Sequence, residues 1–508
     1  MAGIGFTLQK LFKEEYFTSR IKAYMYSAII SAGPWIAAVL TVNFLLFISS
    51  YYFEETAQRD LFMGTIVYSF VFSQILTAPW QFIITRYISD KLYIKDYKSI
   101  KSSFTGLSKL VCVISIVVSI VFYAKTDLPL YYKFMAIFLF VFICLLWIVM
   151  VYLSAIKNYG VISYAYIIGG IVSIVLAFIF YKYKLNFHEY SIASSILFAY
   201  LMGIIITYGI LLYSFLMNFI YGNNKEYDFL RYLNRFKSLF LIGLFYTLGL
   251  WIDDLIMWYS ELGVDIHQTY KYAPLYDNAV FLAYLTVIPT MILFLVQIET
   301  EFYPLYRKYF GLATKSGTFE EIEVARVQMK NSVFRQLIYT LETQTIISLT
   351  LIVLSGTIFS YLNILLIVRD IFRIATLGAL CNIFVLVIIL ILLYFEGKKE
   401  SVIISLTFLS LNGFFTLYFI PKRVEYYGVG YFMGSFISLI LALILLVMFM
   451  KNINYSTFGR QPIFLPKEKG LFVTISNILN HITENRNKKI LFNILISVLI
   501  LFFTYIYQ

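Results

Sequence analysis

Long apolar runs separated by short polar connections make up most of this chain of 508 residues. Most runs contain about twenty residues or more, the length that an α-helix needs to cross the hydrocarbon core of a membrane. The pattern therefore predicts an all-α polytopic membrane protein. The predicted spans lie near residues 23–50, 61–88, 105–124, 130–155, 161–181, 191–220, 239–259, 276–302, 337–361, 366–395, 402–420 and 428–450. A further run at 490–507 is just long enough to form a thirteenth span.

The polar segment at residues 221–238 divides the predicted spans into two sets of six. Because each set holds an even number of spans, both sets enter the membrane from the same side. Basic residues interleave with apolar ones near the start of the chain, a pattern typical of a helix that lies on the membrane surface. We expect an amphipathic N-terminal helix at 1–22, a first six-helix bundle at 23–220, a cytosolic linker at 221–238, a second six-helix bundle at 239–450 and a tail at 451–508 that carries the extra run.

Composition supports the membrane assignment, with 61% hydrophobic residues, 13% charged residues and a mean hydropathy of +0.81. The net charge of +12 comes from basic residues that lie mainly in short loops between apolar runs. With the N-terminus in the cytosol, 30 of the 40 Lys and Arg residues fall on the inner side and ten on the outer side. This asymmetry favours a cytosolic N-terminus, and it accounts for the charge without a nucleic-acid partner.

Motifs for several kinds of chemistry are absent from the sequence. There is no Gly-rich phosphate-binding motif of the type that powers ATP-driven pumps. The three histidines lie in separate loops, and the three cysteines lie inside apolar runs without metal-ligand spacing. We therefore expect no cofactor, no metal site and no enzymatic activity.

Two adjacent acids, Asp253 and Asp254, interrupt the apolar run LGLWIDDLIMWYS at residues 248–260. A charge near the bilayer centre costs roughly 2.5 to 3.5 kcal/mol on insertion scales, so such residues usually face a protein interior or a watery cavity. On a helix, Trp251, Asp254 and Trp258 share one face. One interpretation is a substrate pathway in which these acids bind a cation or proton, or contact sugar hydroxyls and amines. The other is a helix that ends early and leaves both acids in interfacial water.

The remaining candidates for a substrate pathway are side chains within spans or at their ends. They are Trp35, Arg86, Glu299, Glu301, Arg369 and Arg373. The two glutamates have an ordinary alternative role as partners of nearby basic residues, and Arg86 as a side chain that reaches lipid phosphate. Arg369 and Arg373 lie one turn apart, where they serve either as interfacial anchors or as ion-pair partners of Asp253 or Asp254.

Five short motifs point to a known family. They are MAGIGF at 1–6, SAGPW at 31–35, TRYISDKLY at 85–93, ETEFYPLYRKYF at 299–310 and VEYYGVGYF at 424–432. Over about residues 1–450 the chain resembles the PelG family of Pel exopolysaccharide transporters, within the multidrug/oligosaccharidyl-lipid/polysaccharide flippase superfamily. The resemblance implies two six-helix bundles around a central lumen, without a catalytic residue.

The same resemblance implies export of a partly deacetylated N-acetylhexosamine-rich exopolysaccharide across the cytoplasmic membrane. It also implies a cytosolic glycosyltransferase, the Pel synthase, and other Pel membrane components that include a cyclic di-GMP-responsive subunit as partners, besides membrane lipids. The residues leave two alternatives open. One is a flippase for a lipid-linked oligosaccharide or a drug, and the other is a scaffold subunit that anchors the synthase. The amphipathic start and the helix-prone segment 303–336 are the expected docking surfaces for the synthase.

Overall fold

The computed structural model describes residues 32–52, 56–156, 159–183, 191–315, 317–455 and 469–484, together with Met25, residues 27–29 and Gly459. Within these residues, twelve helices are long and apolar enough to cross a membrane. The all-α polytopic fold predicted from the sequence is therefore confirmed. The predicted N-terminal helix at 1–22 and the apolar run at 490–507 lie outside the described residues.

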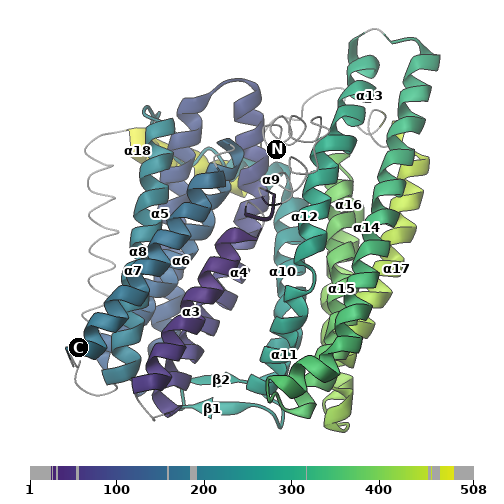
Figure 1. Ribbon diagram of the computed structural model, residues 1–508. Helices are drawn as coiled ribbons and strands as arrows, with labels where there is room; N and C mark the ends of the chain where they lie inside the picture. Colours follow the sequence, from purple (N-terminus) through teal and green to yellow (C-terminus); the bar gives the residue numbers. More distant parts are fainter. Residues whose placement is uncertain are drawn as a thin grey trace. The chain divides into compact units, whose positions relative to one another are not determined.

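The chain forms two compact units. Unit 2 comprises Pro34–Leu248, Val264–Tyr272 and Pro462–Gln508. Its long helices are α3 (Gly33–Tyr52), α4 (Thr56–Tyr93), α5 (Tyr97–Tyr123), α6 (Leu130–Ile156), α7 (Tyr159–Lys182), α8 (Ser191–Asn218) and the first part of α10 (Lys237–Met257). It also contains α9 (Leu230–Arg235), the strands β1 (Val264–Ile266) and β2 (Tyr270–Tyr272), and α18 (Leu471–Glu484) (Figure 1).

Unit 1 comprises Met1–Gly33, Gly249–Gly263 and Ala273–Gln461. After the end of α10 its elements are α11 (Pro274–Leu285), α12 (Ile288–Gln297), the π-helical turn η1 (Ile298–Phe302), α13 (Tyr303–Lys315), α14 (Phe319–Tyr361), α15 (Leu366–Tyr394), α16 (Lys398–Phe419), the 3₁₀ turn η2 (Val424–Tyr426) and α17 (Val429–Lys451). Helix α15 has the most buried span of the twelve and forms the centre of this unit, with α11, α14, α16 and α17 packed against it.

Helix α14 is much longer than the span predicted at 337–361. It begins at Phe319 because Thr318 and Glu321 form a capping box, in which the side chain of each accepts a hydrogen bond from the backbone N–H of the other. The predicted helix-prone segment at 303–336 is therefore α13 and the first part of α14, which pack against each other.

The polar segment predicted as a linker packs tightly against α5. Glu226 is 3% exposed, and its carboxylate lies 2.8 Å from the Lys109 ammonium. A Cβ atom on Gly106 would lie 2.1 Å from the Glu226 carbonyl oxygen, so only glycine lets the segment approach so closely. The division between the compact units falls inside α10, between Leu248 and Gly249. The bundle boundaries expected from the sequence remain a prediction.

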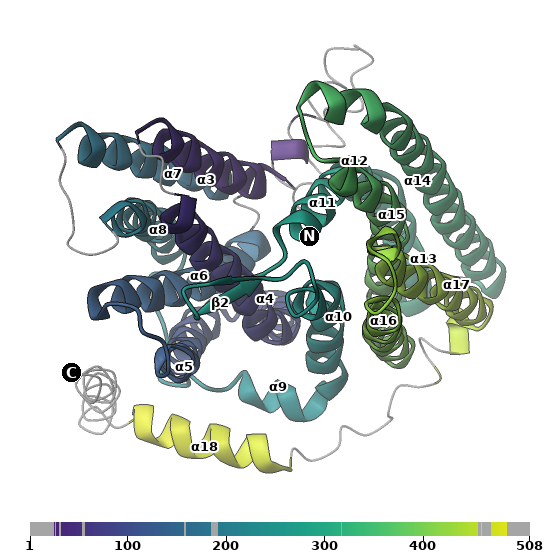
Figure 2. The same cartoon turned by 90° about the horizontal axis from the view of Figure 1, so that it is seen from below.

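The β1–β2 hairpin between α10 and α11 is held in unit 2 by a buried tyrosine. The Tyr270 hydroxyl lies 2.7 Å from that of Tyr123 and accepts a hydrogen bond from Thr65 at 3.1 Å. Beside it, the Tyr68 hydroxyl donates to the Lys271 carbonyl and accepts from the Lys271 N–H. Burial raises the pKa of Tyr270, so its phenol keeps the proton that this network needs. At the other end of unit 2, α18 lies beside α9 (Figure 2).

Candidate functional site

Asp253 is fully buried within unit 1, where it accepts two hydrogen bonds from neighbouring helices. The Tyr276 hydroxyl of α11 donates to one carboxyl oxygen at 2.8 Å. The Asn412 amide of α16 donates to the other at 2.9 Å. Helix α10 continues past both acids to Met257, so the alternative in which the helix ends before them does not apply. Asp253 thus ties α10 to α11 and α16.

Asn412 is placed by close packing on both sides of α16. Its amide nitrogen also donates to the Gly249 carbonyl at 2.9 Å, while its oxygen accepts a hydrogen bond from Thr416 at 3.3 Å. A Cβ atom on Gly249 would lie 2.7 Å from the Phe408 ring, and one on Gly434 would lie 2.6 Å from the Asn412 backbone. Small residues at helix contacts let backbones approach and exchange such interhelical hydrogen bonds. The orientation of Asp253 is therefore fixed by its surroundings.

Asp254 points to a different neighbour, the carboxyl group of Asp277 in α11. The two carboxyl groups lie close enough for their charges to interact. Two carboxylates are both acceptors, so a hydrogen bond between them requires a shared proton, and a cation can take the place of that proton. One oxygen of each, Oδ2 of Asp254 and Oδ1 of Asp277, is buried without a donor. The indole N–H of Trp258 donates to Oδ2 of Asp277 at 3.0 Å.

Asp253, Asp254 and Asp277 together form what we call the acid cluster of unit 1. No Lys, Arg or His within the described residues forms an ion pair with any of them. The same part of the chain contains no group of three or more His, Cys, Asp or Glu side chains placed to hold a metal ion. Chemically, the donor-free oxygens of Asp254 and Asp277 can accept a proton, an amine or a hydroxyl group.

The tryptophans predicted for the pathway lie in different surroundings. Trp258 is 2% exposed and contacts the acid cluster through its hydrogen bond to Asp277. Trp251 is half-buried on α10. Trp35 belongs to unit 2, where it is 37% exposed on α3. Within unit 1, the structure therefore brings Trp258 together with the acids.

The charged candidates at the span ends have partners of their own. Arg86 forms an ion pair with Asp90 at 3.2 Å and lies over the Phe236 ring, whose centroid is 5.3 Å away. Glu301 lies 3.4 Å from Arg335. For Glu299 only the backbone, in η1, is described.

Arg369 and Arg373 both contact Asp370, at 3.0 and 3.7 Å, and Arg373 also donates to Ser355. The expectation that these arginines pair with Asp253 or Asp254 is not met, because Asp370 lies in the same helical turn and satisfies them locally. Their proposed role in a substrate pathway remains a prediction.

Three residues of this site were not singled out in the sequence, namely Asp277, Tyr276 and Asn412. Asp277 lies in the first turn of α11, where an acid is favoured by the helix dipole and gives no unusual signal. Asn412 lies inside α16, a span of low charge, and an asparagine there could have drawn attention as a residue that needs a buried partner.

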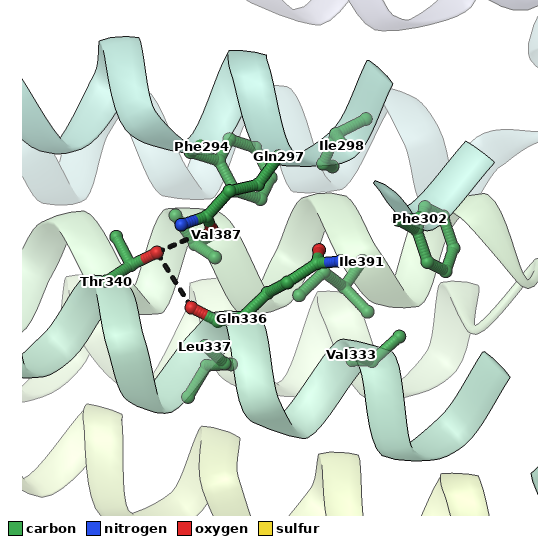
Figure 3. A pocket seen from close by; sticks show the side chains of 10 residues that line it. All are labelled: Phe294, Gln297, Ile298, Phe302, Val333, Gln336, Leu337, Thr340, Val387 and Ile391. Atoms are coloured by element: carbon green, nitrogen blue, oxygen red, sulfur yellow. Dashed lines mark hydrogen bonds between the residues drawn. The ribbon is translucent and has the colours of Figure 1, made fainter. Parts of the chain in front are cut away.

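A second polar feature of unit 1 runs between α12 and α14. On α14, Ser332, Gln336, Thr340, Gln344 and Ser348 recur every four residues and are all buried. Figure 3 shows the middle of this row, where the Thr340 hydroxyl contacts both the Gln297 side chain, at 2.7 Å, and the Gln336 carbonyl. Gln297, Gln336 and Thr340 line a cavity of about 20 Å³, enough for one water molecule, together with apolar side chains.

Solved structures of transporters share this fold. A MOP superfamily transporter from Pyrococcus furiosus, described as having a binding pocket of reverse polarity, matches with a TM-score of 0.56 and 14% identity over 85% of this chain and 96% of that one. A multidrug resistance MATE family transporter in an outward-facing conformation matches with a TM-score of 0.57 and 11% identity, over 84% of this chain and 96% of that one. The MATE transporter ClbM in complex with Rb+ matches with a TM-score of 0.57 and 14% identity, over 86% of this chain and 96% of that one. The chain thus has the fold of a MATE-like transporter of the MOP superfamily.

The family model of the PelG exopolysaccharide exporters (EPS-E) matches residues 1–458, and the chain belongs to this family. The resemblance seen in its motifs is therefore confirmed. No curated protein matches the chain. Family and fold together identify the chain as a multi-pass membrane protein that belongs to a class of polysaccharide transporters. Helix α18 lies beyond the matched residues.

Proposed function

We propose that this chain carries a partly deacetylated, N-acetylhexosamine-rich exopolysaccharide across the bacterial cytoplasmic membrane, with its N-terminus in the cytosol. The observation that carries the proposal is the family match over residues 1–458, on a chain with a transporter fold. Deacetylation exposes amines on the polymer, and protonated amines are cations. The acid cluster supports such a substrate because it offers carboxyl oxygens without donors.

Within this proposal the three acids have different roles. Asp253 already accepts hydrogen bonds from Tyr276 and Asn412, so it holds α10 in place. Asp254 and Asp277 have the buried oxygens that lack a donor, and these oxygens bind amines or hydroxyls of the polymer when the pathway opens to them. Trp258 orients Asp277 through its indole N–H and adds an aromatic surface beside the acids. The remaining proposed pathway residues are Trp251, Trp35, Arg86, Glu299, Glu301, Arg369 and Arg373.

Polymer secretion by cells that carry Asp254→Asn or Asp277→Asn tests this role. The substitutions keep the shape and remove the negative charge, so secretion falls at unchanged protein level. Asp265→Asn is the matched control, since Asp265 is an exposed acid of β1, and it leaves secretion unchanged. Normal secretion by both cluster variants would remove these acids from the mechanism.

We further propose that the chain works with a cytosolic glycosyltransferase, the Pel synthase, and with other Pel components that include a cyclic di-GMP-responsive subunit. The α13–α14 pair is the proposed docking surface for the synthase. Its support is an exposed apolar row near the start of α14, where Phe319, Val324 and Val327 are 83%, 49% and 42% exposed. Val324→Glu with Val327→Glu lowers co-purification of the synthase, and unchanged co-purification would refute this surface.

The scaffold alternative is separated from transport by reconstitution. Vesicles that contain the synthase and this chain, with sugar donor outside, accumulate polymer inside if the chain conducts it. If the synthase binds the chain and makes polymer that stays outside, the chain anchors the enzyme instead. A flippase for lipid-linked oligosaccharide would move a labelled lipid-linked sugar across the membrane of vesicles that contain this chain and no synthase.

A further inference from the structure

Helix α18 is attached to unit 2 through its polar face. Ser476 donates to the Tyr227 carbonyl at 2.9 Å, and Asn480 accepts from the Tyr227 N–H at 2.8 Å. One turn further on, Thr483 donates to the Asn224 carbonyl at 2.7 Å. All three side chains are buried. They bind backbone groups of the segment between α8 and α9, and Ser476 is a second donor to the Tyr227 carbonyl, which also accepts from the Leu230 N–H.

The opposite face of α18 is apolar and points away from this contact. Its residues recur at helical spacing in the sequence LFVTISNILNHITE, and they are Leu471, Ile475, Ile478, Leu479 and Ile482. Leu471 is 69% exposed and Ile478 is 57% exposed. A surface helix of a water-soluble protein turns its apolar face to the core and its polar face to water. In α18 this arrangement is reversed, so its apolar face needs an apolar environment outside the protein.

The position of α18 identifies the membrane as that environment. The segment that it holds joins the end of α8 at Asn218 to the start of α10 at Lys237, and both of these helices are membrane spans. Helix α18 therefore lies within a few residues of the membrane boundary. Figure 2 looks along the long helices of unit 2 and shows α18 lying across their direction, beside α9.

Basic residues lie near both ends of α18. Lys469 precedes the helix, and its carbonyl accepts a hydrogen bond from Asn234. Lys225 lines a surface hollow beside Glu484, the last residue of the helix, together with Lys91, Arg231 and the acids Asp96 and Asp228. Lysines beside an in-plane apolar face are attracted to anionic lipid headgroups. We infer that α18 is an interfacial helix that inserts its apolar face into the lipid headgroup region and so fixes the segment 221–236 at the membrane surface.

Fluorescence quenching on the full chain tests this inference. Ile478→Cys and Asn477→Cys are made in a background with the three native cysteines replaced, labelled with an environment-sensitive fluorophore, and reconstituted into phosphatidylethanolamine/phosphatidylglycerol vesicles. Asn477 is the matched control because it is the preceding residue and is exposed on the polar side, where its side chain accepts a hydrogen bond from Arg231.

The label at residue 478 is expected to be quenched several-fold more by brominated lipid than the label at 477, and less by iodide in the water. Equal quenching of both labels by iodide would overturn the inference, since the apolar face would then be in water. A second measurement guards against misfolding of one variant: both proteins must elute as a single species of the same size before reconstitution. The outcome is independent of polymer transport.

Discussion

The hydrogen bond between Asn412 and Asp253 should contribute measurably to the stability of unit 1. Asn412→Leu removes the donor to a fully buried carboxyl group and to the Gly249 carbonyl, while leaving a side chain of similar volume. A buried acceptor that loses its partner costs about 1–3 kcal/mol, and more when it is charged. Interhelical hydrogen bonds in membrane proteins average only about 0.6 kcal/mol, because the unfolded state in the membrane also finds partners. We therefore expect Asn412→Leu to lower the free energy of unfolding by about 2 kcal/mol.

A double-mutant cycle isolates this interaction from general packing effects. Asp253→Leu removes the acceptor, so Asn412→Leu should cost less in that background than in the native chain. We expect a coupling energy of about 1 kcal/mol, within the range found for residues in contact. Unfolding is followed by circular dichroism as denaturing detergent is added to the protein in micelles.

Asn382 provides the matched control. It is a buried asparagine of α15 in the same unit, and its amide donates to the Tyr431 hydroxyl. Asn382→Leu combined with Asp253→Leu should be additive within about 0.5 kcal/mol. If Asn412→Leu and Asp253→Leu are also additive within that margin, the reasoning about the acid cluster is refuted.

Two further predictions concern unit 2. Lys109→Met removes the ion-pair partner of the buried Glu226, so the free energy of unfolding should fall by about 3 kcal/mol. Adding Glu226→Gln removes the uncompensated charge and should restore much of that loss. No recovery in the double variant would contradict this prediction. Burial would raise the pKa of Asp96, but hydrogen bonds from Ser99 and the charge of Lys91 outweigh it and hold the pKa below its usual range. The stabilisation from this helix cap is therefore present above about pH 4 and lost as the pH falls. Asp96→Ala should cost about 1 kcal/mol at pH 7 and clearly less at pH 3, and an equal loss at both would count against the carboxylate.

The spans could be predicted from the sequence because the membrane imposes a simple rule. Backbone groups in lipid must be satisfied within the segment, so every crossing is a helix of known length and apolar composition. The full length of α14 could not be predicted from the same rule. Its first part is polar and is held by a cap and by α13, while hydropathy detects only the apolar part at 337–361.

The acid cluster could be predicted only in part. Asp253 and Asp254 stand out because they interrupt an apolar run, whereas Asp277 lies at the start of a helix where acids are ordinary. Asn412 is 159 residues from Asp253, and nothing in the local pattern of α16 specifies that partner. For the arginines at 369 and 373 the sequence left two interpretations open, interfacial anchors or ion-pair partners of Asp253 or Asp254, and the nearby Asp370 makes the second unnecessary.

The most direct test of polysaccharide transport is polymer accumulation inside sealed vesicles that contain the synthase and this chain. With the sugar donor supplied outside, polymer protected from an added glycosidase should build up with the native chain, and much more slowly with Asp254→Asn and Asp277→Asn combined. Vesicles with synthase alone set the background. Polymer that stays fully sensitive to the glycosidase in the presence of the native chain, while synthesis proceeds, would contradict the account.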